Sequence, residues 1–185
     1  MSMSVESIVI ATDLNKTFKA EQKGLDDVQA LQGINMQIKT GQLTALVGPD
    51  GAGKTTFLRL IAGLYKPTAG SLEVLGMDVA KDPQSVQDRI SYMPQKFGLY
   101  EDLSIQENLD LYADLHGVPM NVRKERFARL LKITDLARFT ERPAGKLSGG
   151  MKQKLGLACT LVRSPELLLL DEPSVGVDPL SRRDL

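Results

Sequence analysis

One loop constrains the fold of this chain more than any other feature. Residues 48–55 read Gly-Pro-Asp-Gly-Ala-Gly-Lys-Thr, with three glycines ahead of a lysine and a threonine. Before it, residues 43–47 form an apolar run broken only by Thr44, typical of a strand whose two faces are both covered. After it, apolar residues recur at helical spacing: Phe57, Leu58, Leu60, Ile61 and Leu64. A strand, a glycine-rich loop and a helix in this order predict an α/β fold.

The residue types of this loop indicate phosphate chemistry. Glycines let the backbone turn so that successive N–H groups point inward, at the positive end of the following helix. Lys54 supplies a charge for the β- and γ-phosphates of a nucleotide, and the Thr55 hydroxyl is placed to ligate Mg²⁺. A glycine turn before a surface helix is the alternative, but it needs no adjacent lysine and threonine. A triphosphate would repel the carboxylate of Asp50, so we expect that side chain to turn away and to form an Asx-type hydrogen bond inside the loop.

Two further segments suit the same chemistry. The apolar strand expected over residues 167–170 ends in Asp171 and Glu172, two carboxylates that we expect beside the phosphate loop. Solvated acids at a strand end are the alternative. Leu147-Ser148-Gly149-Gly150-Met151 combines a residue type that caps helices with two glycines that bare the first N–H groups of a helix, which makes a second anion site. Alone, Ser-Gly-Gly would more often be a flexible turn.

With these three segments in this order, the chain resembles the ATP-binding cassette (ABC) family from about Ile8 to its last residue. Residues 111–115 and the run Met151-Lys152-Gln153-Lys154 look most like ATP-binding subunits of bacterial multidrug or antibiotic exporters. Some of those carry two cassettes in one chain, of which this would be the N-terminal one. The resemblance implies a P-loop NTPase core with a mixed sheet, an antiparallel β edge subdomain and an inserted helical subdomain.

The resemblance also implies the domain organisation. We expect a single nucleotide-binding domain over residues 1–185, with residues 1–95 and 165–185 as the ATPase core and residues 96–164 as the helical subdomain. The family places a switch histidine about thirty residues after the catalytic glutamate, whereas the only histidine here, His116, lies upstream. We therefore expect a domain incomplete at its C-terminus, which binds ATP, hydrolyses it weakly or not at all, and self-associates.

The site residues implied by the resemblance fall into three groups, for the cofactors ATP and Mg²⁺. The catalytic group is Glu172 as general base, Gln95 near the lytic water, and Lys54 on the phosphates. The residues expected to bind ATP are Phe18, Gly48, Pro49, Asp50, Gly51, Ala52, Gly53, Lys54, Thr55, Thr56, Ser148, Gly149, Gly150 and Asp178. The expected Mg²⁺ ligands are Thr55, Gln95 and Asp171.

Plainer explanations exist for three of these residues. Phe18 is expected to stack on adenine, but it would also suit a position in the core. Gln95 would also suit a strand exit, and Asp178, expected to bridge the two sites of a dimer, would suit an ordinary turn.

The two anion sites of one domain cannot contact the same ATP. The resemblance to the family implies a head-to-tail dimer with a second ATPase domain. A membrane-spanning transporter subunit is the other expected partner, through the residues that follow Gln95, namely Phe97, Leu99, Tyr100 and Leu103. Packing inside the helical subdomain explains those residues equally well. The alternatives are an ABC ATPase that acts on ribosomes or DNA, or an inactive regulatory fragment.

Charge and hydropathy narrow these alternatives. Lys plus Arg and Asp plus Glu both number 23, so no global field attracts nucleic acid, and we expect none as partner. The longest aliphatic run, residues 167–170, is far shorter than the ~18 residues of a membrane span. The first residues do not form a signal peptide. We therefore expect a cytoplasmic chain, peripheral on the cytoplasmic face of the inner or plasma membrane, with the basic run from Arg123 to Lys132 as a solvated face.

Local patterns predict the remaining elements. Residues 7–11 and 34–38 are expected to form an antiparallel edge, with further strands over residues 72–74 and 90–93. Ser104 and Glu107 have the spacing of a capping box that opens a helix. Another helix is expected to begin near Asn121 and to bury Phe127, Leu130 and Leu131. The single cysteine, Cys159, is interpreted as a small core residue.

Overall fold

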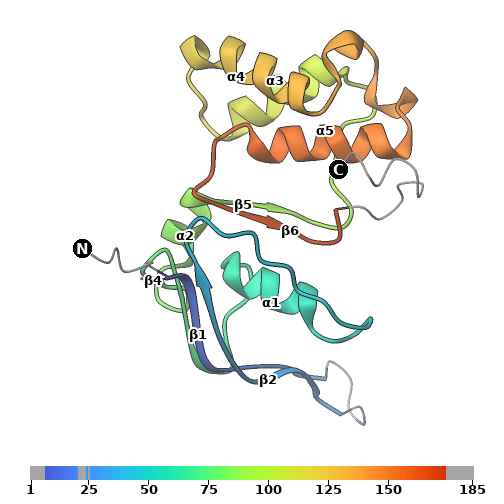
Figure 1. Cartoon of the computed structure of the whole chain (residues 1–185). Coiled ribbons are helices and arrows are strands. Elements are labelled where there is room, and N and C mark those ends of the chain that lie inside the picture. Colours follow the sequence, from blue (N-terminus) through green and yellow to red (C-terminus); the bar gives the residue numbers. More distant parts are fainter. Residues whose placement is uncertain (1–6, 21–23, 25, 174–185) are drawn as a thin grey trace. The chain divides into compact units, whose positions relative to one another are not determined.

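The computed structural model describes residues 7–20, 24 and 26–173. The chain divides into two compact units, residues 1–90 and residues 91–185, which are described separately here. Figure 1 labels their helices and strands. Of the residues described, no helix is both long and apolar enough to span a membrane.

An antiparallel sheet forms most of the first unit. Its strands are β1 (Ser7–Phe18), β2 (Val28–Lys39), β3 (Ala69–Val74) and β4 (Met77–Asp78), in the order β2-β1-β3-β4. The two long strands β1 and β2 lie side by side in Figure 1. The predicted antiparallel edge is confirmed, and both of its strands extend beyond the predicted residues. The core of this sheet is formed by the buried residues Val9, Leu14, Leu72 and Val74.

Two helices accompany the sheet. The predicted helix after the glycine loop is α1 (Lys54–Ile61), which buries Phe57, Leu60 and Ile61. Gly63 follows it with φ 67°, a left-handed conformation that suits a glycine after a helix end. The second helix, α2 (Pro83–Arg89), was not predicted. The sequence signal for α2 is Asp82 followed by a proline, a pattern typical of a helix start. In the structure the Asp82 side chain caps the helix, accepting a hydrogen bond from Ser85 N at 3.1 Å.

The strand predicted over residues 43–47 was wrong. Residues 42–49 have no regular secondary structure, and Leu43 and Val47 are 101% and 94% exposed. The physical reason is that a strand requires a hydrogen-bonding partner. In the described part of the sheet, β1 already pairs with β2 on one side and β3 on the other, and this run pairs with neither.

The second unit combines three long helices with two short strands. β5 (Ile90–Met93) and β6 (Leu167–Leu170) form a two-stranded sheet, as both were predicted to be strands. The helices are α3 (Ile105–Leu115), α4 (Met120–Ile133) and α5 (Gly149–Leu161), with short 3₁₀ helices η1 (Ala137–Phe139) and η2 (Ala144–Lys146) between the last two. Helix α5 contacts both α3 and α4.

Local signals account for where these helices begin and what they bury. The capping box at α3 is confirmed: Ser104 Oγ accepts from Glu107 N at 3.2 Å, and Ser104 N donates to Glu107 Oε2 at 2.7 Å. The predicted helix near Asn121 is α4, and its buried residues Phe127, Leu130 and Leu131 are those expected. Cys159 is fully buried in the same core, as predicted. Burial also raises the pKa of its thiol, so Cys159 is not a reactive thiolate.

Candidate functional site

The glycine loop in the first unit is built around two left-handed residues. Gly51 has φ 78° and Gly53 has φ 85°. A Cβ at Gly53 would lie 2.6 Å from the carbonyl oxygen of Ala30 and 2.7 Å from Leu31 Cδ2, so only glycine fits where the loop meets β2. Ala52 N donates to Pro49 O at 3.3 Å inside the loop. The loop therefore has a specific bend and not merely a flexible turn.

The loop ends at a helix start that suits an anion. Gly53 is the N-cap of α1, makes no side-chain cap hydrogen bond, and is followed by a first turn without acidic residues. Lys54 Nζ donates to the carbonyl oxygens of Gly48 and Pro49, both at 2.8 Å, which places its ammonium against the loop. Uncapped N–H groups beside a lysine ammonium form a cationic site for phosphate oxygens.

The other predicted residues of the loop lie around this site. Thr55 and Thr56 are partly buried in the first turn of α1, and Gly48, Pro49 and Ala52 are exposed. Asp50 is also exposed and makes no side-chain hydrogen bond to a described residue. The loop-internal bond expected of Asp50 is therefore not formed within the described chain.

The predicted metal ligand Asp171 follows β6 in the second unit. Its backbone N donates to Met93 O at 2.9 Å, which continues the pairing of β6 with β5. The side chain is 2% exposed, and its Oδ2 accepts a hydrogen bond from Tyr92 OH at 2.9 Å. Sequence reasoning missed Tyr92, because its only signal is its place in the predicted strand 90–93.

The predicted base Glu172 lies against the predicted glutamine. Gln95 Nε2 donates to Glu172 Oε2 at 3.0 Å, although the two residues are 77 positions apart. Glu172 has φ 50°, a left-handed backbone that costs a non-glycine residue about 1–2 kcal/mol. Such a strained conformation persists only where the surroundings hold it, and it is frequent at functional sites. We therefore regard the pair of Gln95 and Glu172 as the candidate catalytic residues of the second unit.

The predicted second anion site opens helix α5. Ser148 is its N-cap and accepts a hydrogen bond from Met151 N at 3.3 Å. Gly149 and Gly150 form the first turn, which contains no acidic residue, and Ser148 and Gly149 are exposed. A helix begins at this segment, so the alternative of a flexible turn was wrong.

Phe18 ends β1 in the first unit and is partly exposed. Its ring meets Tyr65 at a centroid distance of 5.3 Å and an interplanar angle of 78°, and Lys16 Nζ lies 4.9 Å from its centroid. Tyr65 is a second residue that sequence reasoning missed. Asp178, the remaining predicted residue, lies outside the described residues.

The segment after Gln95 was given two explanations. Phe97 and Leu99 pack against the helical core, and Phe97 also meets Tyr112 at 5.1 Å, whereas Tyr100 is 53% exposed. Packing therefore accounts for Phe97 and Leu99.

The basic run from Arg123 to Lys132 includes two arginines with structural contacts. Arg123 donates to Val118 O and forms an ion pair with Asp114, and Arg126 donates to Val162 O. These two side chains therefore stabilise the helical unit.

Each unit by itself contains residue types that fit ATP with Mg²⁺. In the first unit, a loop of N–H donors with a lysine suits the triphosphate, and Thr55 offers an oxygen ligand. In the second unit, Gln95 and Asp171 each offer an oxygen ligand. In the described part of the chain, no group of three or more His, Cys, Asp or Glu residues could hold a metal ion by itself.

Comparison with known proteins places these features in a family. Residues 31–175 match the family model described as "ABC transporter". The chain is 55% identical over 180 residues to the "Probable multidrug ABC transporter ATP-binding protein YbhF" of Escherichia coli (strain K12), covering 97% of this chain and 30% of YbhF. It is 36% identical to the "Bacitracin transport ATP-binding protein BcrA" of Bacillus licheniformis, covering 98% of this chain and 56% of BcrA.

A solved structure agrees with these sequence matches. The "Dimeric structure of a post-hydrolysis state of the ATP-binding cassette MJ0796 bound to ADP and Pi" superposes with a TM-score of 0.80 at 27% identity, covering 95% of this chain and 78% of that one. The predicted fold class is thereby confirmed. This chain, with its α/β fold and its match over residues 31–175, belongs to the ABC transporter family.

Proposed function

We propose that this chain binds ATP with Mg²⁺ as part of an ABC ATPase domain that hydrolyses ATP and thereby powers an exporter of drugs or antibiotics. The observation that carries the proposal is the loop that ends in Lys54, whose ammonium lies 2.8 Å from two loop carbonyls at an uncapped helix start. A triphosphate would compete for the ammonium, because a phosphate oxygen is a stronger partner for a charged donor than a carbonyl is.

The residues of the second unit are proposed to activate water. Glu172 accepts a proton from the water that attacks the γ-phosphorus, the bond to the β-phosphate oxygen breaks, and ADP and phosphate result. Gln95 already donates to Glu172 Oε2 at 3.0 Å, so it orients the carboxylate that takes this proton. Mg²⁺ is proposed to be held by Thr55, Gln95 and Asp171, and when bound it neutralises charge on the phosphate oxygens.

A head-to-tail dimer with a second ABC ATPase domain is part of the proposal. The starts of α1 and α5 are both helix N-termini without acidic residues in the first turn, so both suit an anion. We propose that Ser148, Gly149 and Gly150 close over the γ-phosphate held by the partner domain. The MJ0796 cassette, whose structure is described as dimeric, supports dimerisation in general.

The transport role rests on the relatives. YbhF and BcrA are described as a probable multidrug ABC transporter ATP-binding protein and a bacitracin transport ATP-binding protein. The chain spans 30% of YbhF and 56% of BcrA, so it corresponds to part of each. We propose a membrane-spanning subunit as partner, a place on the cytoplasmic face of the membrane, and residues 96–164 as the helical subdomain inserted into the ATPase core.

One set of variants tests the chemistry. Glu172→Gln should bind ATP as the parental chain does, stop hydrolysis, and form an ATP-dependent dimer in size-exclusion chromatography. Lys54→Ala should weaken ATP binding in calorimetry. Glu141→Gln is the matched control, because Glu141 is an exposed acid of the same unit without a hydrogen bond to a described residue. Parental hydrolysis by Glu172→Gln would make the base assignment wrong.

A further inference from the structure

We propose that Tyr65 and Thr68, in the turn after α1, are positioning residues that hold Phe18 so that one face of its ring receives the nucleotide base. This inference rests on the proposed function, because it requires ATP at the glycine loop. The inference explains how Phe18, at the partly exposed end of β1, keeps its ring in a fixed orientation.

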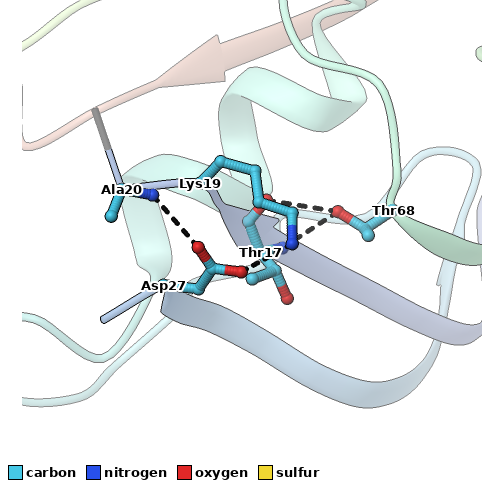
Figure 2. Close-up of polar contacts among 5 residues, drawn as sticks. All are labelled: Thr17, Lys19, Ala20, Asp27 and Thr68. Carbon is cyan, nitrogen blue, oxygen red and sulfur yellow. Dashed lines mark hydrogen bonds and ion pairs between the residues drawn. The ribbon is translucent and has the colours of Figure 1, made fainter. Parts of the chain in front are cut away.

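The first observation concerns the backbone beside Phe18. Pairing between β1 and β3 ends at Asn15 and Ala69, where Thr68 N donates to Asn15 O at 2.9 Å. Beyond that point the Thr68 hydroxyl, instead of the backbone of β3, makes the hydrogen bonds to β1. It accepts from Thr17 N at 3.0 Å and donates to Thr17 O at 3.3 Å (Figure 2). One side chain therefore holds both polar groups of the residue before Phe18.

The chain just after Phe18 is tied as well. Lys19 Nζ forms an ion pair with Asp27 Oδ2 at 2.7 Å, and Ala20 N donates to Asp27 Oδ1 at 3.1 Å (Figure 2). Asp27 lies just before β2, so these bonds close the hairpin one residue beyond the ring. Phe18 is thus held between two fixed points of the backbone.

The second observation concerns the ring itself. Three distances are nearly equal: 5.3 Å between the Phe18 and Tyr65 centroids, and 4.9 and 5.5 Å from Lys16 Nζ to the same two centroids. If Tyr65 and Lys16 lay on opposite faces of Phe18, they would be about twice as far apart as they are. Both therefore lie toward one side of the ring, and neither covers the opposite face.

The third observation links this ring to the phosphate loop. Arg59 belongs to α1, and its guanidinium donates to Tyr65 OH at 3.1 Å. Its carbonyl accepts from Leu64 N at 2.9 Å and from Tyr65 N at 3.3 Å. Helix α1 begins at Lys54, so one short rigid element joins the lysine of the phosphate site to the turn that holds Phe18. A base on Phe18 and a phosphate at Lys54 would then be kept at a constant separation.

Comparison of two ligands tests the proposal. ATP contains a base, whereas inorganic tripolyphosphate offers the phosphates alone. Tyr65→Leu should weaken ATP binding about tenfold, as partial loss of a base–aromatic stack requires, and should leave tripolyphosphate binding within about twofold. Tyr65→Phe keeps the ring and should bind ATP within about threefold of the parental chain.

A second pair of variants tests the backbone contact. Thr68→Val has nearly the same shape but no hydroxyl, and should selectively weaken ATP binding, whereas Thr68→Ser keeps the hydroxyl and should retain it. Both ligands are titrated by calorimetry into proteins whose circular dichroism spectra match. Equal losses for ATP and tripolyphosphate, or no loss for either ligand, would overturn the positioning role.

The same titrations separate this inference from the proposed function. If the parental chain bound tripolyphosphate as tightly as ATP, the phosphate loop would stand and the base platform at Phe18 would be overturned. If it bound neither ligand, the proposed function itself would fail, and the positioning role with it.

Discussion

At the scale of single residues, the two left-handed glycines of the phosphate loop make different demands. Gly51 and Gly53 both have positive φ, so an L residue at either costs about 1–2 kcal/mol. A Cβ at Gly51 meets nothing within 4 Å, whereas at Gly53 it would lie 2.6 Å from a backbone oxygen. We expect Gly51→Ala to cost about 1 kcal/mol and Gly53→Ala about 2 kcal/mol more. Urea unfolding of the two variants measures this, and equal losses would contradict the packing argument.

The environment of Tyr112 predicts how the free energy of unfolding depends on pH. Burial, followed by the nearby Cys159 and Tyr100, raises the pKa of Tyr112 from 10.0 to about 12. Its hydroxyl donates to Gly98 O at 2.7 Å, which also requires the neutral form. Because the unfolded chain loses this proton near pH 10, the stabilisation is fully present below pH 10 and is lost as pH rises toward 12.

The matched variant for that prediction is Tyr112→Phe. It should lose about 1 kcal/mol of stability at pH 8, where the hydrogen bond is intact. Its free energy of unfolding should then fall less steeply than that of the parental chain between pH 9 and pH 11. Ile133→Ala, at a 64% exposed position with no ionisable group, serves as the control, and its slope should equal the parental one. Parallel slopes for all three proteins would contradict the assignment.

At the scale of elements, one buried amide joins helix α3 to the loop before it. Asn108 is fully buried, donates to the carbonyl oxygens of Tyr100, Leu103 and Ser104 at 2.9–3.2 Å, and accepts from Tyr100 N at 3.0 Å. Asn108→Ala removes these four hydrogen bonds from a buried position and should cost about 3 kcal/mol in urea unfolding.

The control for that change is Asn121→Ala in the exposed first turn of α4. Asn121 has no hydrogen bond to a described residue, so its loss should stay within about 0.5 kcal/mol. Similar effects of the two substitutions would show that Asn108 contributes helix propensity alone.

The elements that could be predicted are those with local signals. Helix α3 was predicted from the capping box at Ser104, and helix α4 from the spacing of Phe127, Leu130 and Leu131, because both signals lie within a few turns of chain. The strand prediction for residues 43–47 was wrong. An apolar pattern indicates that a segment suits burial, but it carries no information about which strand the segment would pair with.

The same limit applies to the candidate site. The glycine loop, the two acids after β6 and the start of α5 were predicted from residue types, because phosphate chemistry restricts those types within short segments. The bonds from Tyr92 to Asp171 and from Gln95 to Glu172 join residues 79 and 77 positions apart. They arise where β5 pairs with β6, and no local spacing encodes that pairing.

At the scale of the whole molecule, nucleotide binding should appear as stability. A ligand that binds only the folded chain adds about 2.7 kcal/mol at a hundred times its dissociation constant. For a chain of 185 residues this corresponds to a rise of about 5–10 °C in the thermal midpoint. We expect that rise with Mg-ATP for the parental chain and for Glu172→Gln, because the proposed base acts after binding.

Lys54→Ala separates this effect from general stabilisation by salt or nucleotide. Among the described residues, the Lys54 ammonium hydrogen-bonds only to the carbonyls of Gly48 and Pro49, both on an exposed loop. Its removal should therefore leave the thermal midpoint without nucleotide nearly unchanged. At the ATP concentration that saturates the parental chain, the variant should show a much smaller rise, because the phosphates lose their charged donor. Differential scanning calorimetry at one protein concentration measures both midpoints. A rise in Lys54→Ala as large as the parental one would place the nucleotide away from the glycine loop.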